Sequence, residues 1–331
     1  MCPRAAHGGA AGPVVDAPRH PCYAPRPVKL HPTATAPPIA YHPVDPPRGA
    51  RYTVLIPTWN NLPFLELCLE SLERNSALPH QVVVHVNEGS DGSLEAVRER
   101  GLAHTHSARN AGICWAMNAA ASLARTDLLA YANDDMYFCP GWDAPLVEAG
   151  LALGHDLWFH SGTMIEPVGA FPAALAPHDF GRRPESFRER DLLAALPSLR
   201  KDDWSGATMP PSVVPRRLWD LAGGYSPELS PGWSSDWDFS MKLWRAGVRH
   251  FRGFGASRVY HFRKVSTSRL RSDDGRALFA RKWGIPASWF FWKVLRHGQP
   301  WTGPLPEMET LPGWRWALLK AKRYRFVPWR S

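Results

Sequence analysis

The sequence predicts an α/β fold, with a mostly parallel β-sheet flanked by helices in a single main domain. Two short runs rich in β-branched residues, YTVLIP (52–57) and QVVVHV (81–86), suit buried parallel strands. Between them, residues 62–75 place apolar side chains at the spacing of an amphipathic helix. Strands and helices keep alternating over roughly 80 residues, and this alternation is typical of βαβ units.

The elements of this first half follow one another closely. Asn61 stands where an N-cap would begin the helix 62–75. After the second strand we expect, in order, a short strand at 103–106, a helix at 111–124 and a strand at 127–132.

The second half is less regular. Residues 165–200 resemble a long insertion, with one weak helix near 185–196. Helices are expected at 215–222 and 236–246, and a strand at about 256–260.

Two segments lie outside the main domain, which we place at 50–285. Residues 1–48 hold twelve prolines and no periodic pattern, which predicts a disordered extension. A mis-assigned start codon would explain this segment equally well. Residues 286–331 form a tail rich in Trp, Phe, Lys and Arg.

The composition is that of a globular protein without a disulfide framework or a membrane-spanning segment. The hydrophobic fraction of 44% and the 16 tryptophans are typical of a globular chain. The five cysteines show no C-x-x-C spacing, which favours a reducing compartment, the cytoplasm, over a disulfide framework. We see neither a signal-peptide pattern nor an apolar run near the length of about 20 residues that spans a bilayer.

The basic charge is concentrated near the C-terminus. The chain has 39 Lys and Arg against 30 Asp and Glu, a net charge of +9. Sixteen of the basic residues but only four of the acidic ones lie from Arg258 onward. This asymmetry indicates an anionic surface or ligand at that end of the molecule.

Polar residues follow the strands of the predicted sheet, at the edge where ligands bind in such folds. They are Thr58 and Asn60, then Asn87 and Glu88, then Asp134 and Asp135. Adjacent carboxylates repel each other unless a cation lies beside them, so Asp134 and Asp135 are candidate ligands of a divalent metal that holds a diphosphate. Capping of a turn explains the pair equally well.

Two further candidates lie in the second half. Asp236 and Asp238 open a predicted helix, where the helix dipole favours carboxylates; one of them is also a candidate general base. His261 follows a strand and is either a core residue or a third metal ligand, since imidazole suits Mn²⁺ or Zn²⁺.

The order of the motifs resembles family 2 of the inverting GT-A glycosyltransferases. The motifs are IPTWN (56–60), VNEGSDGS (86–93), RNAGICWAMNAA (109–120), NDD (133–135) and GGYSPELSPGWSSDWDFSMKLWRAG (223–247). The resemblance covers about 52–265. It implies a Rossmann-like GT-A domain with a nucleotide-binding half at 50–140 and an acceptor-binding half at 141–285.

The resemblance also implies roles for individual residues. It places the nucleotide-sugar at Pro57, Thr58, Asn60, Glu88, Arg109 and Asp134, with Arg109 near the diphosphate and Asp134 at the ribose. It implies that Asp135 is a ligand of Mn²⁺ or Mg²⁺, and it favours His261 as a second ligand of the same metal. Asp236 becomes the base that deprotonates the acceptor hydroxyl, although Ser235 stands where the family has a glutamate.

The acceptor is expected to be a glycan or a lipid-linked sugar, as in the assembly of cell-envelope polysaccharide. Candidate acceptor contacts are Trp204, Tyr225, Trp233 and Asp238. In the tail, aromatic residues interleaved with Lys and Arg suit a peripheral contact with the inner face of the membrane, or packing back on the domain. Nucleic-acid binding is less favoured, because the body of the chain shows no second feature for it.

Two other functions compete with sugar transfer. One is a non-catalytic relative that binds a sugar nucleotide or glycan, against which the retained Asp135 and Asp236 argue. The other is a nucleotidyltransferase, which would carry a Gly-rich basic loop after the first strand, whereas TWNNLPF (58–64) has neither glycine nor a basic residue.

Overall fold

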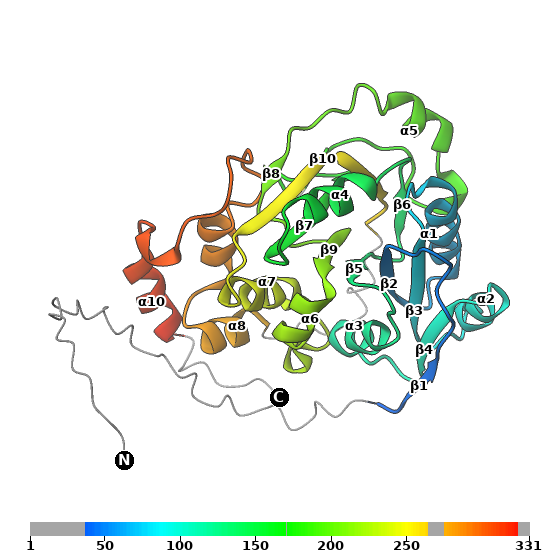
Figure 1. Ribbon diagram of the computed structural model, residues 1–331, viewed down its shortest axis with the longest axis horizontal. Helices are drawn as coiled ribbons and strands as arrows, with labels where there is room; N and C mark the ends of the chain where they lie inside the picture. The colour runs from blue at the N-terminus through cyan, green and yellow to red at the C-terminus, as the bar shows by residue number, and fades with distance from the viewer. Residues whose placement is uncertain (1–36, 170, 264–274, 324–331) are drawn as a thin grey trace, which may run out of the picture.

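The computed structural model describes residues 37–169, 171–263 and 275–323. Within them, a central β-sheet carries helices on both faces (Figure 1). The expected α/β fold with a largely parallel sheet is therefore confirmed.

The first half of the chain is a βαβ run. Strand β2 (Tyr52–Trp59) leads through α1 (Leu62–Asn75) to β3 (His80–Asn87); β4 (Ala103–Ser107), α3 (Ile113–Ser122) and β5 (Leu128–Tyr131) follow. β4, β3, β2 and β5 lie side by side, and all of them pair in parallel. The predicted strands and helices of this half are confirmed, with only their ends displaced.

Two short elements of this half were not expected. Helix α2 (Ser93–Glu99) follows β3, and β1 (Ile39–His42) pairs antiparallel with β4. Strand β1 lies in the segment for which we expected no structure, so the structure differs from that expectation at 39–42. The free edge of β4 supplies backbone partners, and the prolines fall outside the paired residues, as edge strands tolerate.

The second half extends the same sheet. Its elements, in order, are β6 (Met136–Phe138), α4 (Ala144–Ala152), β7 (Trp158–Ile165), β8 (Trp204–Ser205), β9 (Ser212–Pro215), α6 (Arg216–Ala222), η2 (Pro227–Leu229), α7 (Ser235–Arg245) and β10 (His250–His261). The strand order is β1-β4-β3-β2-β5-β9-β7-β10-β6, with β8 beside β10. The helices expected at 215–222 and 236–246 are confirmed, and the strand expected at 256–260 is the end of the longer β10.

The long connection between β7 and β8 packs against the sheet. It contains η1 (Pro184–Ser186) and α5 (Glu189–Ala195), close to the helix expected at 185–196. Leu192 and Leu196 of this segment join a small apolar cluster with Tyr137 and Tyr260, so the insertion is anchored by its own apolar residues.

The two faces of the sheet carry separate apolar cores. Val54 and Ile56 of β2 face the cluster that includes α1 and α4, whereas Leu55 faces the cluster that includes α3, α6 and α7. This alternation is the period of two that a strand imposes. Because both faces are covered, most residues of the parallel strands are buried.

The first part of the C-terminal tail belongs to the second of these cores. After α8 (Gly275–Trp283), the chain forms α9 (Ala287–Trp289), the π-helical turn η4 (Phe290–Val294), η5 (Met308–Thr310) and α10 (Trp314–Arg323). Phe290, Val294 and Leu295 are fully buried, and Phe290 packs edge-on against Trp244 of α7. Trp289, Phe290 and Phe291 are covered by the domain, so these residues follow the alternative of packing back on the domain, whereas Trp292 is 41% exposed. Residues 324–331 lie outside the described part.

Candidate active site

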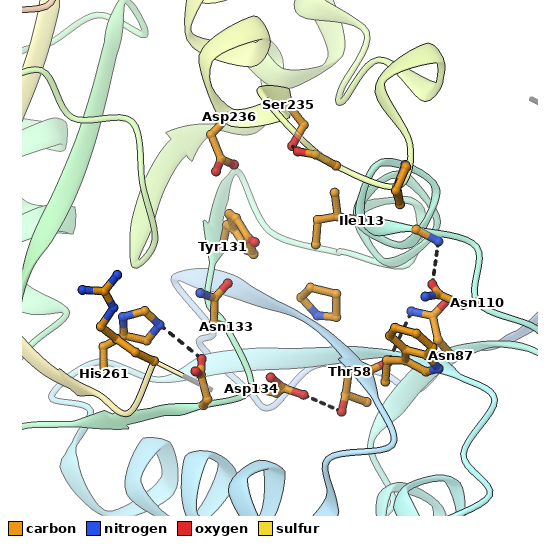
Figure 2. A pocket seen from close by; sticks show the side chains of 17 residues that line it. Thr58, Asn87, Asn110, Ile113, Tyr131, Asn133, Asp134, Ser235, Asp236 and His261 are labelled. Carbon is orange, nitrogen blue, oxygen red and sulfur yellow. Dashed lines mark hydrogen bonds and ion pairs between the residues drawn. The ribbon is translucent and has the colours of Figure 1, made fainter. Parts of the chain in front are cut away.

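A cavity of about 430 Å³ opens at the carboxyl ends of the parallel strands (Figure 2). Its walls come from the ends of β2, β3, β5 and β10 and from the starts of α3 and α7. Of the residues that we expected at a site, this cavity brings together Pro57, Thr58, Asp134, Asp135, Asp236 and His261. The connections between the strands thus bring side chains that are far apart in the sequence to one end of the sheet.

The two adjacent carboxylates lie in the floor of the cavity. Asp134 and Asp135 are only 9% and 4% exposed. The Thr58 hydroxyl donates a hydrogen bond of 2.7 Å to Oδ2 of Asp134, which ties the end of β5 to the end of β2. A carboxylate held this way presents a fixed acceptor to a ligand.

Asp135 is coupled to His261 and, through it, to Glu166. His261 Nε2 lies 3.4 Å from Oδ1 of Asp135, and His261 Nδ1 lies 2.8 Å from Oε1 of Glu166. Burial lowers the pKa of His261, but the carboxylates of Asp135 and Glu166 outweigh it and raise this pKa to about 9. The ring is therefore held between two acids at the end of β10.

These residues fit a divalent cation that takes only part of its coordination shell from the protein. A carboxylate oxygen and an imidazole nitrogen face the same cavity, and both suit Mn²⁺ once the His261 ring has lost its extra proton. Among the described residues, no group of three or more His, Cys, Asp and Glu could hold a metal. The remaining ligands would then have to be water and the oxygens of a bound diphosphate.

Asp236 lies across the cavity from Asp134, in the first turn of α7 (Figure 2). The hydroxyl of Tyr225 donates a hydrogen bond of 2.9 Å to Oδ1 of Asp236. Burial raises the pKa of Asp236 to about 6, although the Tyr225 hydrogen bond opposes this rise. A carboxyl with this pKa is mostly ionised at neutral pH and can accept a proton from a substrate.

Contact between two loops sets the position of α7. The Ile113 amide at the start of α3 donates to the Pro231 carbonyl at 3.1 Å. Gly112 allows this approach, because its φ is +76° and an added Cβ would lie 2.9 Å from Pro231 Cα. The glycine in the predicted motif at 109–120 therefore allows the loop before Asp236 to lie against the start of α3.

Three of the expected nucleotide-sugar contacts do not line the cavity. Asn60 Nδ2 donates to Oε2 of Glu88 at 3.0 Å, so these two bond to each other beside it. Arg109 is exposed and outside the lining residues. Instead, Asn87 lies in the wall and joins three segments: its Nδ2 donates to the Thr58 carbonyl, and its Oδ1 accepts from the Ala111 amide.

Three of the expected acceptor contacts are buried and cannot stack on a sugar. Trp204 is 3% exposed, and its indole donates to Thr163 Oγ1. Tyr225 is 2% exposed and bonds to Asp236. Asp238 is fully buried. These assignments are therefore corrected, because tertiary packing covers aromatic and acidic side chains that sequence alone leaves open. Trp233 remains 43% exposed.

Asp238 is instead the centre of a buried ion pair. Lys282 Nζ lies 3.0 Å from Oδ1 of Asp238 and 2.8 Å from Oε1 of Glu228. The Trp283 indole and the Ser226 hydroxyl also donate to Asp238, at 2.7 and 2.5 Å. This network joins α8 to α7 and to the turn around η2 that precedes α7.

We expect Lys282→Met to destabilise the protein by about 3–5 kcal/mol, because it leaves a buried carboxylate without its cation. Urea unfolding followed by circular dichroism measures the difference. Lys293→Met, at an exposed position on η4, is the matched control and should change stability by less than about 0.5 kcal/mol. Equal stability of the two variants would contradict this role for Lys282.

Sequence reasoning missed two residues at the cavity, Glu166 and Arg263, and assigned a third, Tyr225, to another role. Tyr225 was assigned to the acceptor, yet it holds the candidate base. Glu166 directly follows β7 and bonds to His261. Arg263 lines the cavity, with its Nη1 3.6 Å from Oε2 of Glu166. The only signal for Arg263 was its place two residues after His261. Glu166 lay in a segment that we interpreted as an insertion.

Comparison with known proteins agrees with the motif order. Residues 53–168 match the model of glycosyl transferase family 2. The match confirms, over that segment, the resemblance indicated by the strand-end motifs. Among curated proteins, none matches the sequence.

Several solved structures have a similar course of the chain. TarS 1–349 of S. aureus has a TM-score of 0.45 at 17% identity, with 64% of this chain and 60% of that chain covered. The same protein in complex with UDP-GlcNAc has a TM-score of 0.49 at 16% identity, with 70% and 66% covered. GalNAc-T7 with UDP, GalNAc and Mn²⁺ has a TM-score of 0.48 at 17% identity, with 65% and 44% covered. The chain thus spans less than two-thirds of the length of each of these structures.

Proposed function

We propose that this chain, whose residues 53–168 match glycosyl transferase family 2, transfers a sugar from a nucleoside-diphosphate sugar to a hydroxyl acceptor. One observation carries the proposal. Asp134 faces Asp236 across a single cavity that Asp135 also lines, so a candidate site for a diphosphate and a candidate base share one space (Figure 2). With the base on one side of the cavity and the diphosphate on the other, transfer would occur in a single displacement that inverts the anomeric carbon.

On the acceptor side, Asp236 takes the proton from the attacking hydroxyl. Its carboxylate is ionised at neutral pH, and Tyr225 holds one of its oxygens in place. The other oxygen is then free to align with the acceptor. Fixed orientation of this kind lowers the entropic part of the barrier.

On the donor side, Asp135 and His261 are the residues that would hold Mn²⁺ or Mg²⁺. Such a cation, when bound, neutralises the charge that develops on the departing diphosphate. Asp134 and Asn87 both line the cavity, and we assign Asp134 to the ribose and Asn87 to the nucleoside end. Arg263 lines the cavity and supplies the positive charge that we had expected of Arg109.

The acceptor and the compartment are parts of the same proposal. A glycan or a lipid-linked sugar is the acceptor class that we propose, with Trp233 as the exposed aromatic contact near the cavity rim. Cys68, Cys114 and Cys139 are free and buried, in keeping with a reducing compartment such as the cytoplasm. A non-catalytic binding role is less favoured, because a pure binder would not need a half-buried base facing the acid pair.

A panel of UDP-, GDP-, dTDP- and CMP-sugars tests the proposal. We expect one nucleotide class to stabilise the protein in thermal-shift and calorimetric titrations with Mn²⁺ and to lose this effect with chelator. That donor should then be consumed when candidate hydroxyl acceptors are added. If no nucleotide stabilised the protein under either condition, the transferase proposal would be abandoned.

The pH profile of transfer should fall on the acid side with a midpoint near 6, because Asp236 must be ionised to act as a base. Tyr225→Phe removes a hydrogen bond that favours the ionised carboxylate. We therefore expect it to move the midpoint upward by roughly one unit. Rates at saturating donor across pH 5 to about 8 measure both profiles. An unmoved midpoint in Tyr225→Phe would show that another group controls the acid limb.

A further inference from the structure

Helix α10 has one face packed on the domain and one face in solvent. Ala317 and Ala321 are 0% and 3% exposed, and Trp314 and Leu318 pack against the apolar core that includes α7. In Figure 1 the helix lies at the outer edge of the molecule, beside α8. Packing on the domain therefore explains the apolar residues of the inner face, but it does not explain those of the outer face.

The outer face carries two large apolar side chains. Trp316 is 55% exposed and Leu319 is 61% exposed. Residues three and four apart share one face of a helix, so Trp316, Leu319 and Lys320 form one surface. Lys320 Nζ lies 4.8 Å from the centroid of the Trp316 ring, which places a cation beside the aromatic face.

The charge of this surface has one sign. Arg315, Lys320 and Lys322 are exposed, and the stretch 311–322 contains no acidic residue. Of the two acids just before it, Glu307 is paired with Arg249 at 2.7 Å. The outer face of α10 therefore combines three basic side chains with two exposed apolar ones.

We propose that the outer face of α10 docks the protein on an anionic lipid bilayer. Basic side chains are attracted to anionic headgroups, while Trp and Leu enter the boundary between headgroups and acyl chains. A phosphate backbone would satisfy the charges but would offer no burial to Leu319, so lipid fits better than nucleic acid. No helix in the described ranges is long and apolar enough to cross a membrane, so contact through α10 would be with the surface.

Sedimentation of the full-length protein with vesicles tests the proposal without any sugar transfer, so its result is independent of the proposed enzymatic function. We expect binding to phosphatidylcholine vesicles that contain phosphatidylglycerol and at least about tenfold weaker binding to phosphatidylcholine alone. Binding should weaken as salt rises through the range in which the Debye length falls below about 10 Å.

Two double variants divide the surface into its charged and apolar parts. Arg315→Glu with Lys320→Glu should weaken binding by at least about tenfold, and Trp316→Ser with Leu319→Ser by about tenfold. The matched control is Arg217→Glu with Leu221→Ser on α6. There the Arg217 side chain is 89% exposed and Leu221 is 71% exposed. This control should bind as the wild type does.

Several results would overturn the proposal. One is the absence of vesicle binding by the wild type, or equal binding to neutral and anionic vesicles. Another is wild-type binding by both α10 variants, or a loss of binding in the α6 control alone. Binding to single-stranded RNA without binding to anionic vesicles would assign the surface to nucleic acid instead.

Discussion

Asp236→Asn is expected to lower the rate of sugar transfer by about 10²- to 10⁴-fold, the usual contribution of a general base. The amide keeps the size of the side chain and can still accept the Tyr225 hydrogen bond, so the start of α7 should be unchanged. It cannot take a proton from the acceptor hydroxyl. Rates at saturating donor measure the loss, and calorimetry should show donor affinity within a few-fold of the wild type.

A second aspartate provides the control for this substitution. Asp220 lies on α6 with its side chain 61% exposed, paired at 3.5 Å with Arg216. Asp220→Asn should leave the transfer rate unchanged. If Asp236→Asn kept a rate close to that of the wild type, Asp236 would not be the base, and the mechanism proposed above would be wrong.

Asp135→Ala is expected to weaken metal-dependent donor binding by at least about 100-fold. It removes the carboxylate oxygen that faces His261, and a site with so few protein ligands cannot lose one without losing the cation. Calorimetric titration of the donor with Mn²⁺ and with chelator measures the effect. The variant should bind equally weakly in both conditions, whereas the wild type should differ between them.

Asp134→Asn separates the roles of the two neighbouring acids. The amide oxygen can still accept from Thr58, so the strand end should keep its position. We expect weaker donor binding that still depends on metal, since Asp134 is assigned to the ribose. If donor binding lost its metal dependence in Asp134→Asn but kept it in Asp135→Ala, Asp134 would be the metal ligand and Asp135 the ribose contact.

The elements that could be predicted are those whose signal is local. Helix α1 was predicted at both of its ends, because the spacing of Leu65, Cys68, Leu69 and Leu72 is visible in the sequence and the same residues are buried. Strands β2 and β3 were found because runs of Val and Ile are rare outside buried strands. Strand β7 was missed, since WFHSGTMI mixes polar and apolar residues that are all buried only through their neighbours in the sheet.

The candidate site divides in the same way. Strand ends indicate where ligands bind, so Thr58, Asp134 and Asp135 could be placed from sequence. The order of side chains along the chain does not show which of them are covered. Trp204 and Asp238 were therefore assigned to the acceptor, although the first packs against His297 and the second is neutralised by Lys282 of a helix 44 residues away.

By itself, then, the sequence determined the α/β class, the edge of the sheet at which the candidate site lies and the residues that carry charge there, because periodicity and strand ends are local properties. The tertiary structure alone decided that Tyr225 holds Asp236, that Glu166 holds His261 and that α10 keeps a basic and apolar face in solvent. These features depend on contacts between segments remote in the sequence, and the burial that shifts the pKa of Asp236 exists only after the chain has folded around it.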